Sequence, residues 1–308
     1  MRQPPPTTDE SLPGADPSAA ANLAEAATDG APWALDDEVT DRPVRPHWVR
    51  ELLTVVAFYL VYQQIRGFAD TKGSTSRAFS NARIVVRAER WLHIFNEQAV
   101  QQAFLGARWF LRLINIYYGT LHFVITIVIL IWLYFRRFHN YRHMRNLLGL
   151  TTALALIGYW AFPLAPPRMF LCSNDIPVFS PDQGWHVGKC FVDTLDSIGG
   201  LWSYYTPVAK AASNPFAAMP SLHFAWALWC GIVFFRFSKH PLVKVLGVLY
   251  PLLTLFAIVV TANHYWLDAV GGAVLLLAAS AILHALERRR SRRAETLAAA
   301  PVDQPSPA

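Results

Sequence analysis

The sequence predicts an all-α polytopic membrane protein: a bundle of six transmembrane helices with an additional amphipathic helix. Hydrophobic residues make up 54% of the 308 residues and charged residues only 16%. About one quarter of a typical soluble domain is charged. The charges also lie outside long apolar runs, and several runs approach or reach the roughly 20 residues that a helix needs to cross the hydrocarbon core.

Six segments are predicted to span the membrane. They are the run near Trp48–Phe68, then Leu113–Phe135, Leu147–Leu164, Pro220–Phe237, Leu242–Ala262 and His264–Leu286. The first is the weakest, because Gln63, Gln64 and Arg66 interrupt it. In residues 80–108 apolar side chains recur at three-to-four spacing, which predicts the amphipathic helix. It either lies in the membrane interface or packs on the bundle.

The sequence divides into three regions. Residues 1–45 are rich in Ala, Pro, Asp and Thr without periodicity, so we expect a disordered tail. Residues 46–287 contain the six spans and form one membrane domain. Residues 288–308 begin with an arginine cluster and end in Ala, Pro and Ser, which predicts a basic and then disordered cytoplasmic tail.

The basic residues predict the orientation. A six-span topology puts four basic segments on one side of the membrane, which the positive-inside rule makes cytoplasmic. They are Arg42, Arg45 and Arg50; Arg136, Arg137, Arg142 and Arg145; Arg236, Lys239 and Lys244; and the arginines from Arg288 onward. The net charge is +6, and the Arg and Lys residues that produce it flank apolar runs. This placement favours a lipid bilayer over nucleic acid as the partner. We expect a plasma-membrane protein with cytoplasmic termini.

Two cysteines, Cys172 and Cys190, fall in one long loop on the other side, and Cys230 falls in an apolar run. Their spacing fits no zinc motif. A disulfide between Cys172 and Cys190 and two unpaired thiols are both compatible with the sequence.

The non-cytoplasmic side also receives the start of the sixth span, where His264 and Asp268 are four residues apart. On a helix this spacing puts both side chains on one face. The aspartate can then fix the imidazole tautomer and make the other ring nitrogen a better nucleophile. A structural His–Asp pair at a helix end is the alternative.

A second polar segment begins the fourth span. His223 lies in its first turn and Ser221 at its expected N-cap. A helix N-terminus offers free backbone N–H groups to a phosphate, and a protonated histidine can give a proton to a departing alkoxide. An ordinary capped helix with a buried histidine is the alternative.

The end of the third span supplies a cation, Arg168, which can bind phosphate oxygens in a two-point fork. Lys210 is a second, weaker candidate. Interface anchoring is the alternative for Arg168. Together the three segments offer a nucleophile, a proton donor, an orienting carboxylate and a cation on one side, which is the set that phosphoryl transfer requires.

These motifs resemble the type 2 phosphatidic acid phosphatase superfamily over roughly residues 110–286. The resemblance lies in Pro-Ser-Leu-His at 220–223 and in His264 and Asp268 flanking Tyr-Trp-Leu. Leu222 and the Ala-Pro-Pro-Arg ending at Arg168 are more similar to its inositol phosphorylceramide synthase branch. The resemblance implies a six-helix bundle that uses no metal or other cofactor.

The resemblance also implies roles. His264 would attack phosphorus to form a phosphohistidine, Asp268 would orient it, and His223 would protonate the leaving group. Arg168 and Ser221 would hold the phosphate.

The sequence departs from the superfamily at three positions. Ala161 stands where the superfamily has Lys, Ile258 where it has Arg, and Met169 where it has Pro. Two phosphate-binding cations are therefore missing. Either other residues replace them, with Lys210, Asn263 and Tyr265 as candidates, or the substrate carries less charge, as a phosphodiester does.

The predicted function is thus a lipid phosphatase or phosphotransferase that acts on a membrane lipid phosphate, with water or an alcohol such as inositol as acceptor. The alternatives are a metal-dependent membrane hydrolase built on His223, His264 and Asp268, and a non-enzymatic transporter. His93, His122 and His284 lie outside the motifs and are expected to be packing or interface residues.

Overall fold

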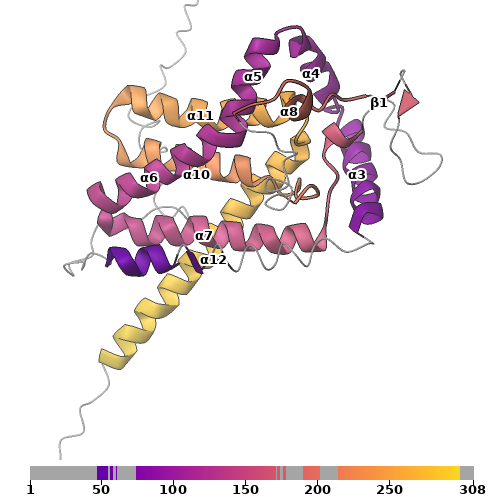
Figure 1. Cartoon of the computed structure of the whole chain (residues 1–308). Coiled ribbons are helices and arrows are strands. Elements are labelled where there is room, and N and C mark those ends of the chain that lie inside the picture. Colours follow the sequence, from indigo (N-terminus) through magenta and orange to yellow (C-terminus); the bar gives the residue numbers. More distant parts are fainter. Residues whose placement is uncertain are drawn as a thin grey trace, which may run out of the picture. The chain divides into compact units, whose positions relative to one another are not determined.

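The structure, a computed structural model, describes residues 47–54, 56–57, 60, 74–170, 172–173, 176–177, 190–201 and 214–298 (Figure 1). The described residues are almost entirely helical, so the all-α prediction is confirmed. Strand pairing among the described residues consists of a short antiparallel contact of β1 (Cys172–Ser173) with β2 (Ile176–Pro177) and an isolated parallel bridge between Leu164 and Ala217. Residues 48–54, 56–57 and 60 are helical as well.

From residue 74 onward the structure describes the following helices and helical turns in chain order. They are α3 (Ser74–Trp91), α4 (Glu97–Leu105), α5 (Arg108–Ile116), the π-helical turn η1 (Tyr117–Leu121), α6 (His122–Arg136), α7 (Phe138–Ala161), the 3-10 turn η2 (Pro167–Met169), α8 (Thr194–Ser197), α10 (Leu222–Phe237), α11 (Pro241–Val260) and α12 (Trp266–Ala298).

Three of the described helices are long and apolar enough to cross a membrane: Arg108–Arg136, Pro241–Val260 and Trp266–Thr296. The first joins α5, η1 and α6 into one helix. The helix Leu222–Phe237 is apolar but shorter. In α7 the charged Arg142 and Arg145 restrict the apolar part to its second half. The described helices support an integral membrane protein, and the count of six spans stays a prediction.

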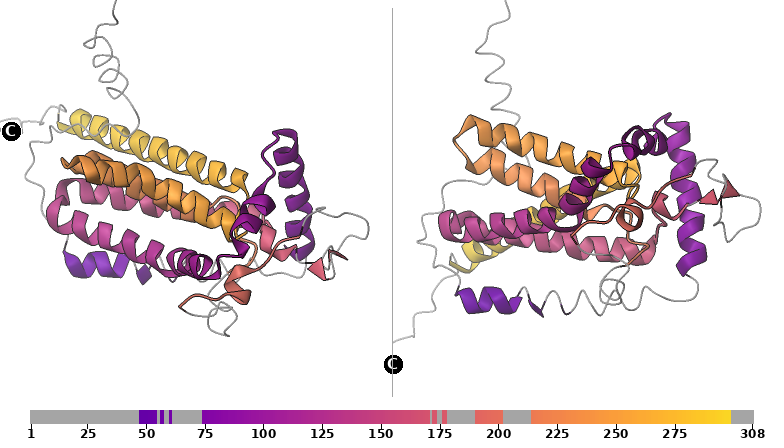
Figure 2. Two further views of the ribbon diagram at one scale, coloured as in Figure 1. Left: turned by 90° about the horizontal axis from the view of Figure 1, so that it is seen from above. Right: turned by 45° about the horizontal axis from the view of Figure 1, so that its top comes forward.

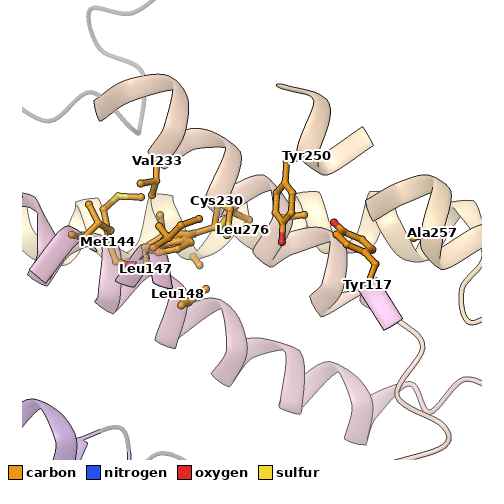
Figure 3. Close-up of a cluster of buried hydrophobic side chains, with 14 of the residues drawn as sticks. Tyr117, Met144, Leu147, Leu148, Cys230, Val233, Tyr250, Ala257 and Leu276 are labelled. Carbon is orange, nitrogen blue, oxygen red and sulfur yellow. Dashed lines mark hydrogen bonds between the residues drawn. The ribbon is translucent and has the colours of Figure 1, made fainter. Parts of the chain in front are cut away.

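Helix α10 lies at the centre of the bundle and contacts α6, α7, α11 and α12 (Figures 1 and 2). Its buried side chains, such as Trp229 and Val233, join one apolar cluster with residues of the neighbouring helices, and Figure 3 shows Tyr117 and Tyr250 within it. Large apolar side chains also stay exposed on the outer faces of α6, α11 and α12. Examples are Val124, Ile127, Val128, Leu246, Leu249, Leu253, Val270, Val274 and Leu277. Exposed apolar surface of this extent fits contact with lipid.

The amphipathic segment differs from its prediction, because residues 80–108 do not form one helix. The chain breaks between α3 and α4 at His93, whose φ of 59° lies in the left-handed region and ends the helix. The apolar face of α3, which includes Phe79, Val85 and Val86, packs on Phe170 and Tyr265. Helix α3 thus packs on the protein, across the end of the bundle where α10 and α12 begin (Figure 2).

The C-terminal boundary also differs from its prediction. Helix α12 continues through the arginine cluster to Ala298 instead of ending near residue 287. Arginine and alanine are good helix formers, and the helix leaves the apolar region without any Gly or Pro to stop it. Residues 1–46 and 299–308 lie outside the described residues, so the predicted disorder of these tails stays a prediction.

Two glycines allow α10 and α11 to cross closely, which yields a direct test. A Cβ on Gly231 would lie 2.4 Å from the carbonyl oxygen of Gly247, whereas a Cβ on Gly149 of α7 would meet no atom within 4 Å. Gly231→Ala is expected to lower the free energy of unfolding by about 1–3 kcal/mol through overpacking. Gly149→Ala is expected to leave it unchanged or raise it by about 0.5–1 kcal/mol. Thermal unfolding of both variants in detergent makes the comparison, and equal melting temperatures would contradict the close crossing.

Candidate active site

The three polar segments singled out in the sequence meet at one end of the bundle. They follow α7, precede α10 and join α11 to α12. Three backbone hydrogen bonds connect them: Leu164 N to Phe216 O at 2.8 Å, Arg168 N to Ala262 O at 2.8 Å, and Ser221 N to Asp268 O at 2.9 Å. Pairs of residues that are 47 to 94 positions apart in the sequence are thereby brought into one buried junction.

His264 is buried in this junction and is held through one ring nitrogen. Its Nδ1 lies 2.9 Å from the carbonyl oxygen of Ala218 and 3.2 Å from Oδ2 of Asp268. A carbonyl oxygen can only accept a hydrogen bond, so Nδ1 must carry the proton and donate it. In the neutral imidazole, Nε2 is then left with its lone pair, which is the nucleophilic form of the ring.

Asp268 is fully buried in the first turn of α12. Its Oδ2 also accepts a hydrogen bond of 2.9 Å from the backbone N–H of Tyr265. The same oxygen therefore caps the start of the helix and orients His264. Its other oxygen, Oδ1, has no hydrogen-bond partner among the described residues.

His223 lies in the first turn of α10, and its ring centroid is 5.8 Å from that of His264. Its ring stacks on Tyr118 with a centroid distance of 4.2 Å. The Nε2 atom of His223 is buried, and no group in the described part of the chain hydrogen bonds to it. The structure therefore brings His223, His264 and Asp268 together, with the ring of His223 beside that of His264, the predicted nucleophile.

Ser221 is the N-cap of α10, and its hydroxyl accepts a long hydrogen bond of 3.4 Å from Phe224 N. Its side chain is fully buried. Gly272 of α12 packs against it so closely that an added Cβ would lie 2.4 Å from the Ser221 carbonyl oxygen. The absence of a side chain at Gly272 thus lets the starts of α10 and α12 approach each other.

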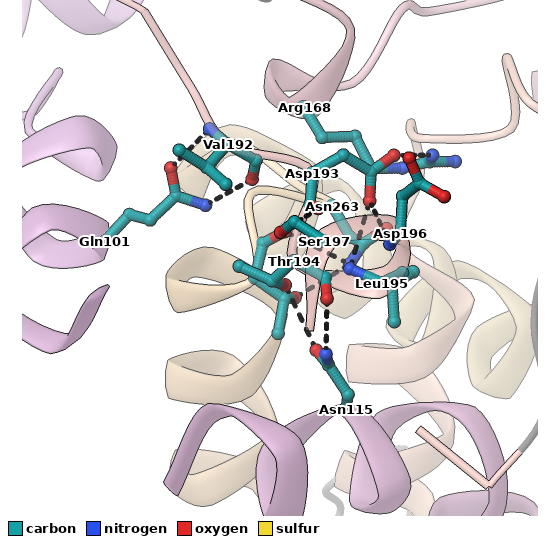
Figure 4. A network of polar contacts seen from close by, with 11 residues as sticks. Gln101, Asn115, Arg168, Val192, Asp193, Thr194, Leu195, Asp196, Ser197 and Asn263 are labelled. Carbon is teal, nitrogen blue, oxygen red and sulfur yellow. Dashed lines mark hydrogen bonds and ion pairs between the residues drawn. The ribbon is translucent and has the colours of Figure 1, made fainter. Parts of the chain in front are cut away.

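Arg168 is held by an acid that the sequence did not indicate. Its Nη1 donates to Oδ2 of Asp193 at 2.9 Å. The other oxygen of Asp193 caps α8 by accepting from the N–H groups of Leu195 and Asp196. Figure 4 shows this network, which includes Asn263. One carboxylate thus fixes the guanidinium and the short helix together.

Two side chains, one from α4 and one from α5, fix the backbone around Asp193. Gln101 of α4 forms a pair of hydrogen bonds with the backbone of Val192, at 2.8 and 2.9 Å. Asn115 of α5 donates to Thr194 O at 2.8 Å and accepts from its hydroxyl at 3.1 Å. These side chains are buried, so they hold the partner of Arg168 rigidly.

Asn263 and Tyr265 are both buried and engaged within the protein. Asn263 Nδ2 donates to Thr261 Oγ1 at 2.8 Å, and the Tyr265 hydroxyl donates to Ala165 O at 3.2 Å. Burial, followed by the charge of Asp268, raises the pKa of Tyr265 well above its usual value of 10, so the hydroxyl stays a donor. Their observed contacts support the loops, and substrate binding by either residue stays a prediction.

Two predictions concern residues outside the described ones. Lys210, the second candidate cation, is one of these residues, so its part in the site stays a prediction. The structure records Cys190 as disulfide-bonded and Cys230 as a free buried thiol. The side chain of Cys172 lies outside the described residues, so its pairing with Cys190 stays a prediction.

His122 was expected to be a packing or interface residue, and the structure puts it next to the site. It is fully buried, its Nδ1 lies 2.9 Å from the hydroxyl of Tyr250, and its ring centroid is 5.2 Å from that of His223. It directly follows the π-helical turn η1. A histidine inside an apolar span and a π-turn are both frequent at functional sites, and the first was visible in the sequence.

With this geometry in view, comparison with known proteins identifies the family. A family model described as the PAP2 superfamily matches residues 83–282, which is more than half of the chain. The chain belongs to the PAP2 superfamily. No curated protein and no solved structure matches the chain. Membership in the PAP2 superfamily supports an enzyme of the lipid phosphoesterase type, in agreement with the site.

Among the described residues, no group of three or more His, Cys, Asp or Glu side chains is arranged to hold a metal ion.

The two functions of Asp193 can be separated by substitution. Asp193→Asn keeps an oxygen that caps α8 but removes the charge that pairs with Arg168, whereas Asp193→Ala removes both. We expect the alanine variant to be less stable than the asparagine variant by about 1 kcal/mol, the usual value of an N-cap. Thermal unfolding of both variants measures this difference. An alanine variant as stable as the asparagine variant would show that Asp193 does not stabilise α8 as its N-cap.

Proposed function

We propose that the protein cleaves the phosphoester of a membrane lipid through a phosphohistidine on His264. The observation that carries the proposal is the pair of hydrogen bonds from His264 Nδ1 to Ala218 O and Asp268 Oδ2, which directs the Nε2 lone pair away from the protein partners. His223 lies beside it with an unoccupied Nε2. A fixed nucleophile next to an acid is the arrangement that covalent phosphoryl transfer needs.

In the first half of the reaction, His264 Nε2 attacks phosphorus and the bond from phosphorus to the lipid alcohol oxygen breaks. Protonated His223 gives its proton to the departing alkoxide. Asp268 accepts the hydrogen bond from the Nδ1–H group of His264 throughout this step and stabilises the positive charge that develops on the ring. The product is the free alcohol and a phosphorus–nitrogen bond to His264.

In the second half, the oxygen of an acceptor attacks phosphorus and the phosphorus–nitrogen bond breaks. The acceptor's proton goes to His223, which restores its initial protonation state. Water as acceptor gives a phosphatase, and an alcohol gives a phosphotransferase. The two activities share one phosphoenzyme and differ only in what occupies the acceptor position.

The charges around the site support transfer of a phosphodiester head group, to or from an inositol-type lipid. Ala161 and Ile258 stand where the superfamily has cations, and Ile258 is fully buried. Arg168 is paired with Asp193, so its charge is partly compensated. A phosphodiester carries one negative charge and a monoester up to two, so the diester fits the smaller positive charge better. Arg168 and Ser221, with Lys210, Asn263 and Tyr265 as further candidates, would contact it.

The proposal includes six spans, cytoplasmic termini and a site at the outer face of the plasma membrane. Packing of the first helix supports its place in the bundle: Glu51 is buried, accepts from the Tyr141 hydroxyl at 3.1 Å and pairs with Arg145 of α7. The basic ends of α6 and α12 support the orientation by the positive-inside rule. The bilayer then supplies the lipid substrate directly to the junction.

One assay tests the proposal. Purified protein in detergent is incubated with labelled lipid phosphates, with and without inositol, beside His264→Ala. We expect turnover that His264→Ala abolishes, and a new inositol-containing product when inositol is added. Absence of turnover on every phospholipid class, or unchanged turnover in the variant, would contradict it. Loss of activity in chelator would favour the metal-dependent hydrolase, and lipid movement without chemical change would favour the transporter.

Asp268→Asn tests the tautomer argument. The asparagine is nearly the same size but no longer carries the negative charge that fixes the Nδ1–H tautomer. We expect kcat to fall by roughly 10³- to 10⁴-fold while the fold is retained, as for the equivalent change in an Asp–His pair of another enzyme class. Steady-state kinetics and thermal unfolding measure the two effects. A variant with wild-type kcat would show that Asp268 only caps the helix.

Arg168→Ala tests the phosphate contact. Loss of one preorganised cation is expected to lower kcat/KM by about 10²- to 10³-fold. Arg136→Ala, at the exposed far end of α6, is the matched control and should change kcat/KM little. An active Arg168→Ala variant would count against the site as drawn.

A further inference from the structure

Two glutamates are buried against the start of α12, outside every motif discussed so far. Glu89 is in the last turns of α3 and Glu97 is the first residue of α4, and both side chains are fully buried. Glu89 Oε1 accepts a hydrogen bond of 2.8 Å from the backbone N–H of Leu267. Apart from the two acids themselves, no group in the described part of the chain forms a hydrogen bond with the other three carboxyl oxygens. Burial of two acids side by side is costly and calls for a physical reason.

The turn between the two helices brings the carboxyl groups together. The N–H of Ile94 donates to Glu89 O at 2.9 Å, and His93 takes a left-handed conformation with φ 59°. The same turn makes a second contact with α12, because Asn96 Oδ1 accepts from Trp266 Nε1 at 2.8 Å. The acid pair and Asn96 therefore hold the first two residues of α12 by two independent hydrogen bonds.

The electrostatics of the pair favour one shared proton. Burial, followed by hydrogen bonding and charge interaction with Glu97, raises the pKa of Glu89 to about 10. The charge of Asp268 also raises the pKa of Glu89, and the charge of Glu89 contributes to the raised pKa of Tyr265. Two carboxylates that share a low-dielectric site cannot both ionise at neutral pH. Glu89 is thus a neutral acid there, and its proton can bridge to Glu97.

The position of Leu267 links the pair to the reaction. Leu267 directly precedes Asp268, whose carboxylate orients His264. A shift in the first turn of α12 would move Asp268 and His264 together. Small displacements of reacting groups cost large factors in rate.

We propose that Glu89 and Glu97 form a proton-bridged carboxyl pair that positions the nucleophile by fixing the first turn of α12, and that ionisation of both acids loosens this turn. The catalytic part rests on the proposed function. Glu89 and Glu97 are positioning residues that act through Leu267 and Asp268. The pair thereby makes α3 and α4 part of the active site's support, not merely a cover over the bundle.

The sign of the pH dependence follows from the direction of the pKa shift. The pKa of Glu89 is raised from 4.5 to about 10, so between these values the folded state binds more protons than the unfolded state. The contribution of Glu89 to the free energy of unfolding is therefore fully present below about pH 4.5 and falls as the pH rises toward about 10. Glu89→Gln keeps the oxygen that accepts from Leu267 N but needs no proton, so it should remove this dependence.

The first arm of the test needs no substrate. Melting temperatures of the wild type, Glu89→Gln and the control Glu287→Gln, in detergent from about pH 5 to about pH 9, show the linkage. Glu287 pairs with His143 at the other end of α12. We expect the melting temperature to fall with pH in the wild type and in Glu287→Gln, and to fall much less in Glu89→Gln. Parallel curves for all three proteins would overturn the shared-proton pair.

The second arm measures the catalytic consequence. Glu89→Gln should keep kcat within a few-fold at neutral pH and extend activity to higher pH, whereas Glu89→Leu should lower kcat about 10- to 100-fold with little change in KM. Faster hydrogen exchange of the peptide that contains Leu267 and Asp268 should accompany the loss. Equal kcat and equal exchange in Glu89→Leu and the wild type would overturn the positioning role.

The two arms separate this proposal from the proposed function. If the wild type turns over no lipid phosphate, the proposed function fails, while melting and hydrogen exchange still decide whether the pair holds α12. If the wild type is active and His264-dependent but Glu89→Leu is unaffected, only the present proposal fails. A Glu89→Leu variant that does not fold leaves Glu89→Gln and Asn96→Ala as tests of the same contact by hydrogen exchange.

Discussion

The structure of the site depends on the hydrogen bonds to one nitrogen, Nδ1 of His264. One acceptor, Ala218 O, precedes α10, and the other, Asp268 Oδ2, belongs to α12. Both can reach the ring only because the two helices start side by side, with Gly272 against the backbone of Ser221. The ring is buried, so water does not compete for these bonds, and in such surroundings a satisfied polar group is held firmly. The position and tautomer of one imidazole thus depend on the packing of two helix starts.

The support extends outward from this ring in successive contacts. Next to Asp268, the backbone N–H of Leu267 donates a hydrogen bond to the buried acid Glu89. Arg168 pairs with Asp193, and the backbone around Asp193 is itself held by hydrogen bonds from buried side chains. Each contact joins residues far apart in the sequence, mostly through backbone groups. The loops at this end of the bundle are therefore held by polar contacts as well as by apolar packing, whereas the centre of the bundle is held mainly by apolar packing. This division suits a membrane enzyme, in which chemistry occurs where polar backbone can be buried in protein.

Much of the fold and part of the candidate site could be predicted from the sequence. Apolar runs predicted the order of α6, α10, α11 and α12 and the approximate bounds of α10 and α11, because hydropathy responds directly to the bilayer. The four-residue spacing of His264 and Asp268 predicted their contact, because helical periodicity makes such pairs meet.

The remaining features could not be predicted, for physical reasons. Ala218 contributes a carbonyl oxygen, which every residue has, so no residue type indicates it. Asp193 and Glu89 contact their partners across long sequence separations, and an acid in a polar loop or an amphipathic helix normally faces solvent. The break at His93 depends on the packing of α3 and α4, which overrides local periodicity. His122 was visible as a lone histidine in an apolar span, yet only the fold brings it beside His223.

The most direct test of the central claim is detection of the covalent intermediate. The purified protein is mixed with a lipid carrying radiolabelled phosphorus, quenched within the first turnover and digested for mass spectrometry. The account predicts an acid-labile, base-stable phosphoryl group on His264, which is absent from His264→Ala. Turnover without any phosphorylated histidine, or with the phosphoryl group on another residue, would contradict it.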